Sequence, residues 1–167
     1  MSAVTWSRVA TSGDARTGVM HTPHGDVATP NFMAVGTRAS VKTIDVEDLE
    51  RLGAQIVLSN TYHLMLRPGE AIVRGLGELH GFTGWDGPIL TDSGGYQVLS
   101  LDPVIKEEHL VFRSTYDGSI VELSPERSVA VQEALGSDIA MVLDVPVALP
   151  ASRRDTEDAM HHTLRWA

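Results

Sequence analysis

The sequence has no cysteine among its 167 residues, which excludes disulfide bonds and thiolate metal sites within this chain. It also lacks a long apolar run. The longest, Ile139 to Val145, is interrupted by Asp144 and is far too short to cross a bilayer. Residues 1–10 have neither the basic start nor the apolar core of a secretory signal. These absences predict a cytoplasmic protein with no membrane partner.

Basic residues are scarce as well. The chain carries 13 lysines and arginines against 22 acidic residues, a formal net charge of −9. Because phosphate contacts supply most of the affinity of nucleic-acid binders, this balance taken alone argues against RNA binding. The sequence shows no GxGxxG fingerprint, no P-loop and no GxSxG elbow, so the common nucleotide-binding and hydrolase motifs are excluded.

What the sequence does contain is an alternation of short apolar strands with longer helical stretches, which is typical of βα units on a parallel sheet. Strands are expected at residues 30–35, 55–59, 88–91 and 138–143. Helices are expected at 46–52, 70–80, 125–136 and from 153 to the end of the sequence. One insertion interrupts the alternation: apolar runs at 110–116 and 119–123 flank Asp117-Gly118, a strong β-hairpin signal.

Two α/β architectures fit this order of elements. Four βα units make about half of a TIM (β/α)8 barrel, whose full length is typically about 250 residues. The alternative is a complete doubly wound sheet. The pattern favours neither one. With no internal repeat or linker, residues 1–167 are expected to form one folding unit.

Polar residues follow three of the expected strands: Asn60, Asp92 and Asp144. Since the carboxyl ends of parallel strands form the active-site face of βα proteins, these three residues are candidate site residues. Asp92 comes just after the apolar pair Ile89-Leu90, with Thr91 between them. Partial loss of solvent there could raise its pKa towards that of a working general base.

The residues after Asp92 add features of a ligand site. Gly94 and Gly95 allow the backbone to approach a planar ligand, and Tyr96 offers a stacking face. The alternative is that Asp92 and Ser93 only cap a turn. For the run from Asp92 to Tyr96 as a whole, we favour a role in a ligand site over turn capping alone.

Asp144 could accept two parallel hydrogen bonds from a guanine-like edge. Taken alone, it is better explained as a carboxylate bonded to nearby loop amides. His63 is better explained by packing than by a role at the site. His21 and His24, and the adjacent pair His161-His162, lack the spacing of a helical zinc site.

At these residues the sequence resembles the tRNA-guanine transglycosylase (queuine tRNA-ribosyltransferase) family, in its bacterial form. The resemblance runs nearly end to end, so a chance match is excluded. It is carried by the segments HTPHGDVATPNFMAVGTRASVK, LSNTYHLMLRPG, GFTGWDGPILTDSGGYQVLSL, FRSTYDGSIVELSPERSV and QEALGSDIAMVLD. The family fold is a TIM barrel, so the resemblance favours the first half of a barrel with an inserted β-hairpin.

The resemblance also implies an activity. The family exchanges guanine at the wobble position of tRNA for a 7-deazaguanine (pre-queuosine base or queuine) in queuosine biosynthesis. Asp92 matches its proton acceptor, and Asp92 to Tyr96, with Ser93, Gly94 and Gly95 between them, its base-binding stretch. Asp144 resembles the carboxylate that reads the purine edge, and Asn60 a polar residue near the ribose. The implied partners are tRNA and a guanine or 7-deazaguanine base, with a homo-oligomer for the full-length protein.

Two departures limit what the resemblance implies. Many bacterial members continue Glu-Cys-Thr after the purine-reading aspartate, whereas Val145-Pro146-Val147 follows here, so the preferred base stays open. The family's nucleophilic aspartate and its zinc site of three cysteines and one histidine lie further towards the C-terminus, so no cofactor is expected in this chain. The chain is therefore expected to be inactive alone. The alternative is a non-catalytic half-barrel subunit, or a purine-binding module that works with a partner.

Overall fold

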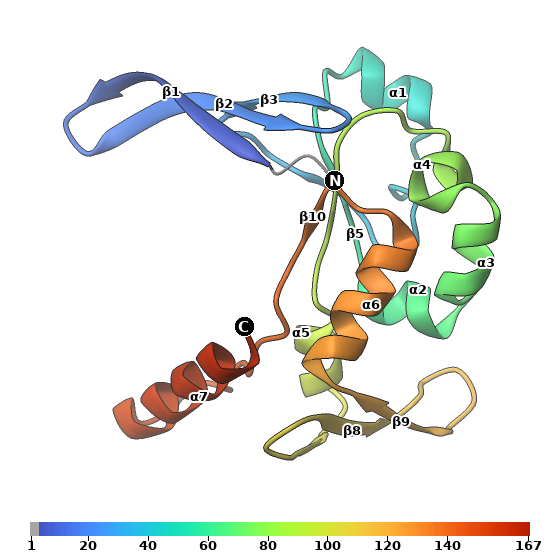
Figure 1. Ribbon diagram of the computed structural model, residues 1–167, viewed down its shortest axis with the longest axis vertical. Coiled ribbons are helices and arrows are strands. Elements are labelled where there is room, and N and C mark those ends of the chain that lie inside the picture. The colour runs from blue at the N-terminus through green and yellow to red at the C-terminus, as the bar shows by residue number, and fades with distance from the viewer. Residues whose placement is uncertain (1–3) are drawn as a thin grey trace.

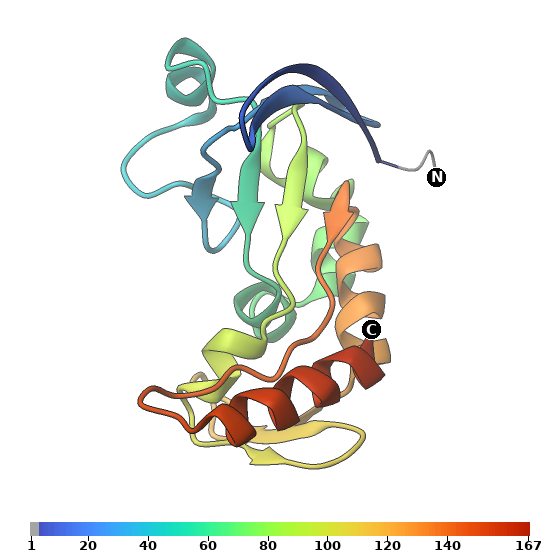
Figure 2. The same cartoon turned by 90° about the vertical axis from the view of Figure 1, so that its left-hand side faces the viewer.

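A parallel four-stranded sheet forms the centre of the molecule, with an antiparallel sheet at each end (Figures 1 and 2). The computed structural model describes residues 4–167, so the first three residues of the expected folding unit lie outside it. The parallel sheet has the order β10-β6-β5-β4, made from β4 (Ala34–Gly36), β5 (Val57–Ser59), β6 (Ile89–Thr91) and β10 (Ile139–Ala140). The antiparallel sheets are β1 (Thr5–Ser12), β2 (Ala15–Thr22) and β3 (Gly25–Thr29), and β7 (Val104–Ile105), β8 (Leu110–Arg113) and β9 (Ile120–Leu123).

Helices connect the parallel strands, as βα units require. They are α1 (Val46–Arg51), α2 (Thr61–Leu66), α3 (Glu70–Gly75), α4 (Glu78–Thr83), α5 (Gly95–Leu99), α6 (Pro125–Leu135) and α7 (Arg153–Trp166). None of these helices is long and apolar enough to cross a membrane. Because the strands run in one direction, their carboxyl ends lie at the same end of the sheet, on the side of β7–β9 and α7. The strands β1–β3 cover the opposite end, where the strands begin (Figure 2).

The two faces of the parallel sheet have separate cores. Val57 and Ile89 pack on the helix side in a large buried cluster that includes Val73, Leu79 and Leu135. On the other face, Ile56 and Leu90 pack against Val27 of β3. The alternation of buried residues along β5 and β6 therefore fixes which face receives the helices and which receives the N-terminal sheet.

The expected helix boundaries at 46–52, 125–136 and 153 onwards are confirmed. Ser124 Oγ accepts a hydrogen bond from Arg127 N at 3.1 Å at the start of α6, and Gly136 ends that helix in the left-handed region with φ 71°. At α7, Ser152 and Asp155 form a reciprocal capping box.

Other expectations were wrong in their extent. The helix expected at 70–80 is divided into α3 and α4 at Gly77, whose φ of 91° breaks the helical path. The strand expected at 30–35 begins only at Ala34, and the one expected at 138–143 ends at Ala140. The hairpin is confirmed, but its loop is wide: Ser114 N donates to Ser119 O at 2.8 Å, with Asp117-Gly118 inside the loop. The N-terminal sheet, α2 and α5 were not predicted.

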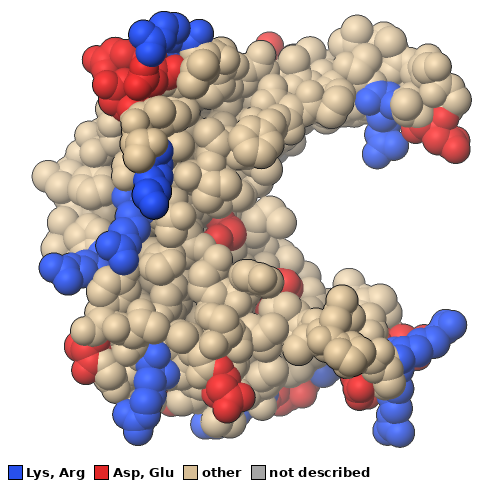
Figure 3. Space-filling model, turned by 180° about the vertical axis from the view of Figure 1, so that it is seen from behind, with Lys and Arg blue, Asp and Glu red and all other residues tan. Residues whose placement is uncertain are grey.

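The parallel sheet stays open among the described residues, with β4 and β10 as its edges. A hollow lies between the arm formed by β1 and β2 and the helix α7 (Figure 3). The visible wall of this hollow is largely uncharged, and most of the lysine and arginine side chains in this view lie away from it.

Candidate functional site

The carboxylate of Asp92 lies at the carboxyl end of β6 and is held by three donors from the neighbouring turn. Thr61 N and Gly94 N donate to its Oδ1 at 3.0 Å and 3.1 Å, and Asn60 Nδ2 donates to its Oδ2. Asn60 in turn accepts a hydrogen bond from His63 N at 3.1 Å, which caps α2. The ends of β5 and β6 thus bring Asn60 and Asp92 together, as the sequence predicted.

Burial raises the pKa of Asp92 above its ordinary value of 3.8. The hydrogen bonds from Thr61, Gly94 and Asn60 oppose this shift because they stabilise the charged form, and the nearby carboxylate of Asp144 adds to it. The balance keeps Asp92 a stronger proton acceptor than an exposed aspartate. The sequence-based expectation of a raised pKa agrees with this geometry.

Gly94 and Gly95 stand where larger residues would not fit. Gly94 has φ 82°, and a Cβ there would lie 3.1 Å from Tyr62 N. A Cβ on Gly95 would lie 3.0 Å from both the backbone oxygen and Oδ1 of Asp144. The two glycines therefore allow the turn after β6 to approach both α2 and Asp144 closely.

Asp144 comes from the segment after β10 and faces the turn that contains Asp92. Ser93 Oγ donates to Asp144 Oδ1 at 3.2 Å and also accepts a hydrogen bond from Gly95 N. Among the described residues, no backbone amide hydrogen-bonds the carboxylate of Asp144. This arrangement argues against the interpretation that loop amides hold it, and leaves acceptor capacity for a ligand.

The two carboxylates line one small pocket of about 270 Å³, close to the lower end of the range of about 300–1,000 Å³ for ligand sites. Its lining comprises Asp92, Ser93, Gly94, Tyr96, Gln97, Met141, Val142 and Asp144. Tyr96 is 74% exposed, which leaves its ring free to stack on a ligand. Gln97 Oε1 is buried without a hydrogen-bond partner among the described residues. Thr61 was missed in the sequence, although it directly follows the predicted site residue Asn60.

His63 lies beside the site and packs against the hairpin. Its Nδ1 lies 3.1 Å from the hydroxyl of Tyr116, and burial followed by the charge of Arg38 lowers the pKa of its imidazole. Arg38 also lies over the Tyr116 ring, 5.5 Å from its centre. A packing role for His63, favoured from the sequence, agrees with these contacts.

Comparison with known proteins now decides the family, because the family described as queuine tRNA-ribosyltransferase matches residues 11–167. The chain belongs to this family. A queuine tRNA-ribosyltransferase of Thermosynechococcus vestitus is 56% identical over 154 residues, covering 91% of this chain and 41% of the relative. One from Thermus thermophilus is 55% identical over 159 residues, covering 94% and 41%. One from Desulforudis audaxviator is 58% identical over 155 residues, covering 92% and 42%.

The chain spans about two fifths of the length of the curated relatives it matches. The zinc ligand set implied by the resemblance, three cysteines and one histidine, does not fit the residues of this chain, because it contains no cysteine.

One cluster of metal-ligating side chains was not predicted: His24, His80 and Asp138, whose donor atoms lie within 4.8 Å of one another. The two imidazole rings stack with their centres 3.6 Å apart and their planes 20° from parallel. Their in-plane lone pairs therefore run side by side and do not converge on one ion, as a tetrahedral site would need. His24 Nδ1 donates to Asp138 Oδ1 at 2.7 Å. We interpret the cluster as a hydrogen-bonded link between β2–β3, α4 and the start of β10.

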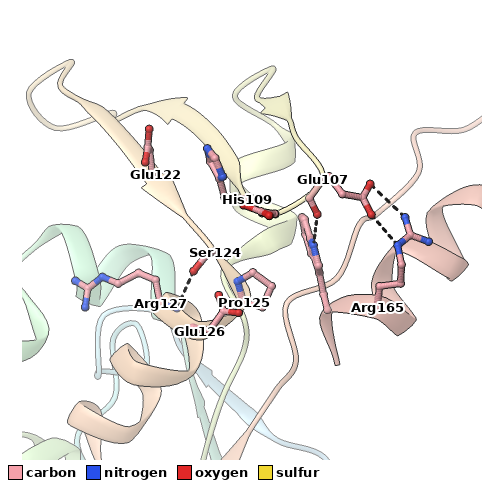
Figure 4. Close-up of a pocket in the computed structure, with 10 residues that line it drawn as sticks. Glu107, His109, Glu122, Ser124, Pro125, Glu126, Arg127 and Arg165 are labelled. Carbon is pink, nitrogen blue, oxygen red and sulfur yellow. Dashed lines mark hydrogen bonds and ion pairs between the residues drawn. The ribbon is translucent and has the colours of Figure 1, made fainter.

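A larger hollow of about 620 Å³ lies between the hairpin, the start of α6 and the end of α7 (Figure 4). Its polar groups hold elements together. Arg165 Nε pairs with Glu107 Oε1 at 2.8 Å, and the indole of Trp166 donates to Glu107 O at 2.8 Å. None of the predicted site residues lines it. The hollow is thus the place where α7 lies against the turn between β7 and β8.

Proposed function

We propose that this chain provides the base-binding part of a tRNA-guanine transglycosylase site, which exchanges guanine at the tRNA wobble position for a 7-deazaguanine. The observation that carries the proposal is the pairing of Asp92 and Asp144 in one pocket. Asp92 lies at the end of β6, Asp144 lies in the segment after β10, and Ser93 connects them. Membership of the queuine tRNA-ribosyltransferase family supplies the substrate class.

Asp144 reads the purine edge in this proposal. Its two carboxylate oxygens accept from the ring N–H and the exocyclic amine of guanine, a bidentate arrangement that geometry and charge both favour. Gly95 leaves room for this carboxylate because it has no Cβ. Tyr96 stacks on the face of the base, as exposed aromatic rings do in many nucleic-acid sites.

Asp92 accepts a proton. As the ring nitrogen of the incoming base forms its bond to the anomeric carbon of the ribose, the bond from that carbon to the family's nucleophilic carboxylate breaks. The N–H bond of the base breaks as well, and its proton moves to the carboxylate of Asp92. The raised pKa supports this role because it brings the acid closer to the pH at which the reaction runs. The family's nucleophilic aspartate matches no residue of this chain, so the step that releases guanine is not assigned here.

The open sheet is proposed to form part of a TIM barrel. Two features support this: the strand order β4-β5-β6-β10 follows the sequence, and helices pack against one face. A purine-binding module that works with a partner is the second candidate, supported by the pocket that Asp92 and Asp144 share with the exposed ring of Tyr96.

The test is calorimetric binding of guanine to the chain and to its Asp144→Asn variant. The asparagine amide turns a donor towards the donors of guanine, so we expect binding about 10- to 100-fold weaker. Hypoxanthine, which lacks the exocyclic amine, should lose less affinity than guanine upon the same change. Asp158→Asn on α7, whose side chain is 72% exposed, is the matched control.

Unchanged guanine affinity in Asp144→Asn, with a lower melting temperature, would show that Asp144 is structural and would refute the proposed binding mode. Equal losses for guanine and hypoxanthine would refute the contact with the exocyclic amine.

A further inference from the structure

Gln132 is a fully buried amide on α6 whose hydrogen-bonding capacity is completely used. Its Oε1 accepts from Met141 N at 2.8 Å and from Thr91 Oγ1 at 2.9 Å. Its Nε2 donates to Met141 O at 2.9 Å and to Ser128 Oγ at 3.2 Å. Exchanging the oxygen and nitrogen of this amide would place like groups against each other at Met141, so the hydrogen bonds determine the orientation of the amide.

The hydrogen bonds between Gln132 and Met141 take the place of those that a neighbouring strand would make. β10 pairs with β6 only through Ile139 and Ala140, and Met141 N reaches Thr91 O at a long 3.3 Å. The side-chain amide of Gln132 meets both backbone groups of Met141, as the peptide of a neighbouring strand would. This contact holds the backbone three residues before Asp144, where one long hydrogen bond to β6 remains.

The same amide also reaches both neighbours of Asp92. Thr91, which precedes Asp92, donates to Gln132 directly. Ser93, which follows Asp92, is reached through Ser128, whose hydroxyl receives the Gln132 N–H and donates to Ser93 O at 2.9 Å. One buried side chain therefore connects the backbone around Asp92 with the backbone that leads to Asp144.

We propose that Gln132 is a positioning residue that sets the separation between Asp92 and Asp144, and through it the fit of the purine. The consequence for purine binding rests on the proposed function, whereas the effect on the backbone does not. Of the residues of similar length, methionine makes none of the four hydrogen bonds, and glutamate loses the two donors and turns an oxygen towards Met141 O. The role therefore requires an amide.

The test compares Gln132→Met with Val131→Ala in the same helix. Val131 is also fully buried but belongs to the apolar core, so its truncation reports the cost of disturbing α6 alone. Guanine binding is measured by calorimetry, at a temperature where circular dichroism shows both variants folded. Amide hydrogen exchange of Met141, relative to amides at the centre of α6, is measured by NMR without ligand.

We expect guanine binding about 10-fold weaker in Gln132→Met, equivalent to about 1.4 kcal/mol, and faster exchange of the Met141 amide by a similar factor. Val131→Ala should lower the melting temperature while changing both readouts less than about twofold. Gln132→Glu should resemble Gln132→Met.

Three results would overturn the inference. One is a Met141 amide that stays protected in Gln132→Met. Another is faster exchange with unchanged guanine affinity, which would make Gln132 structural only. The third is an equal loss of affinity in Val131→Ala. If the unsubstituted chain binds no guanine, the proposed function fails, and hydrogen exchange at Met141 still decides whether Gln132 holds this backbone.

Discussion

Protonation of Asp138 should weaken the hydrogen-bonded contact between the N-terminal sheet β1–β3 and the parallel sheet. Its side chain is fully buried and meets three elements: His24 Nδ1 donates to Oδ1 at 2.7 Å, Ile89 N donates to Oδ2 at 2.9 Å, and His80 Nε2 lies 3.6 Å from Oδ2. Burial alone would raise the pKa of this acid. The contacts with His80, Ile89 and His24 outweigh burial and lower its pKa from 3.8 to about 2.

The size of the effect follows from this shift. One pKa unit corresponds to about 1.36 kcal/mol, so a fall from 3.8 to about 2 contributes about 2 kcal/mol to the free energy of unfolding. Because the pKa of the folded state is the lower one, this contribution is fully present above about pH 4. It is lost as the pH falls towards 2.

The assay is urea unfolding of the wild type and of Asp138→Asn between pH 2 and pH 7. The asparagine cannot ionise, so the difference in unfolding free energy between the two proteins should shrink by about 2 kcal/mol from pH 7 to pH 2. Asp158→Asn, at an exposed position on α7, should show no such change. A difference that stays constant across this range would refute the assignment of the ionised carboxylate to this link.

Three further predictions concern the site and the sheet edges. In a full-length protein that contains this chain, Asp92→Asn should slow exchange of labelled guanine into tRNA by about 10²- to 10⁴-fold. Guanine binding should change only a few-fold. An exchange rate equal to that of the wild type would exclude Asp92 as the proton acceptor. Gly95→Ala should weaken guanine binding about 10-fold or more, because its Cβ would lie 3.0 Å from Asp144 Oδ1. Gly75→Ala, where a Cβ meets nothing within 4 Å, is its control, and equal affinities would contradict the crowding argument. Residues 1–167 alone should associate through the open edges β4 and β10, and a monomer at all concentrations in light scattering would contradict this.

The elements that the sequence predicted well are those whose signals are local. Ser124-Pro125 at the start of α6 and Gly136 at its end mark that helix within a few residues of chain, and Ser152 with Asp155 marks the start of α7. Capping depends on backbone groups three or four residues away, so the residue order alone carries the information.

The N-terminal sheet shows where such reasoning fails. Every residue of β1 is exposed, so the strand has no buried face and no apolar alternation to mark it. Its stability comes from pairing with β2, with Thr5 opposite His21 and Ser12 opposite Ala15. The division between α3 and α4 was missed for a related reason, because the apolar spacing continues through Gly77 although the backbone does not.

The site was predictable to the extent that it follows from strand direction. Asn60 and Asp92 each follow a parallel strand, and the carboxyl ends of β5 and β6 are neighbours, so their contact follows from the topology. Gln132 carries no such mark. Its contacts with Thr91 and Met141 depend on how α6 lies against the sheet, which only the packed structure shows.

Each end of the parallel sheet holds a partly or fully buried carboxylate, and the pKa values of the two are shifted in opposite directions. At the N-terminal edge, Asp138 meets imidazole and amide donors, and the balance lowers its pKa to about 2. At the C-terminal end, Asp92 accepts three hydrogen bonds, but burial and the neighbouring Asp144 prevail and raise its pKa. An acid that stays charged over the working pH range suits a structural link. An acid whose charged form is destabilised by its surroundings suits the transfer of a proton, because less free energy is needed to protonate it. The two roles differ in the balance of burial and hydrogen bonding. For Asp138 the contacts with His80, Ile89 and His24 outweigh burial, whereas for Asp92 burial outweighs the hydrogen bonds from Thr61, Gly94 and Asn60.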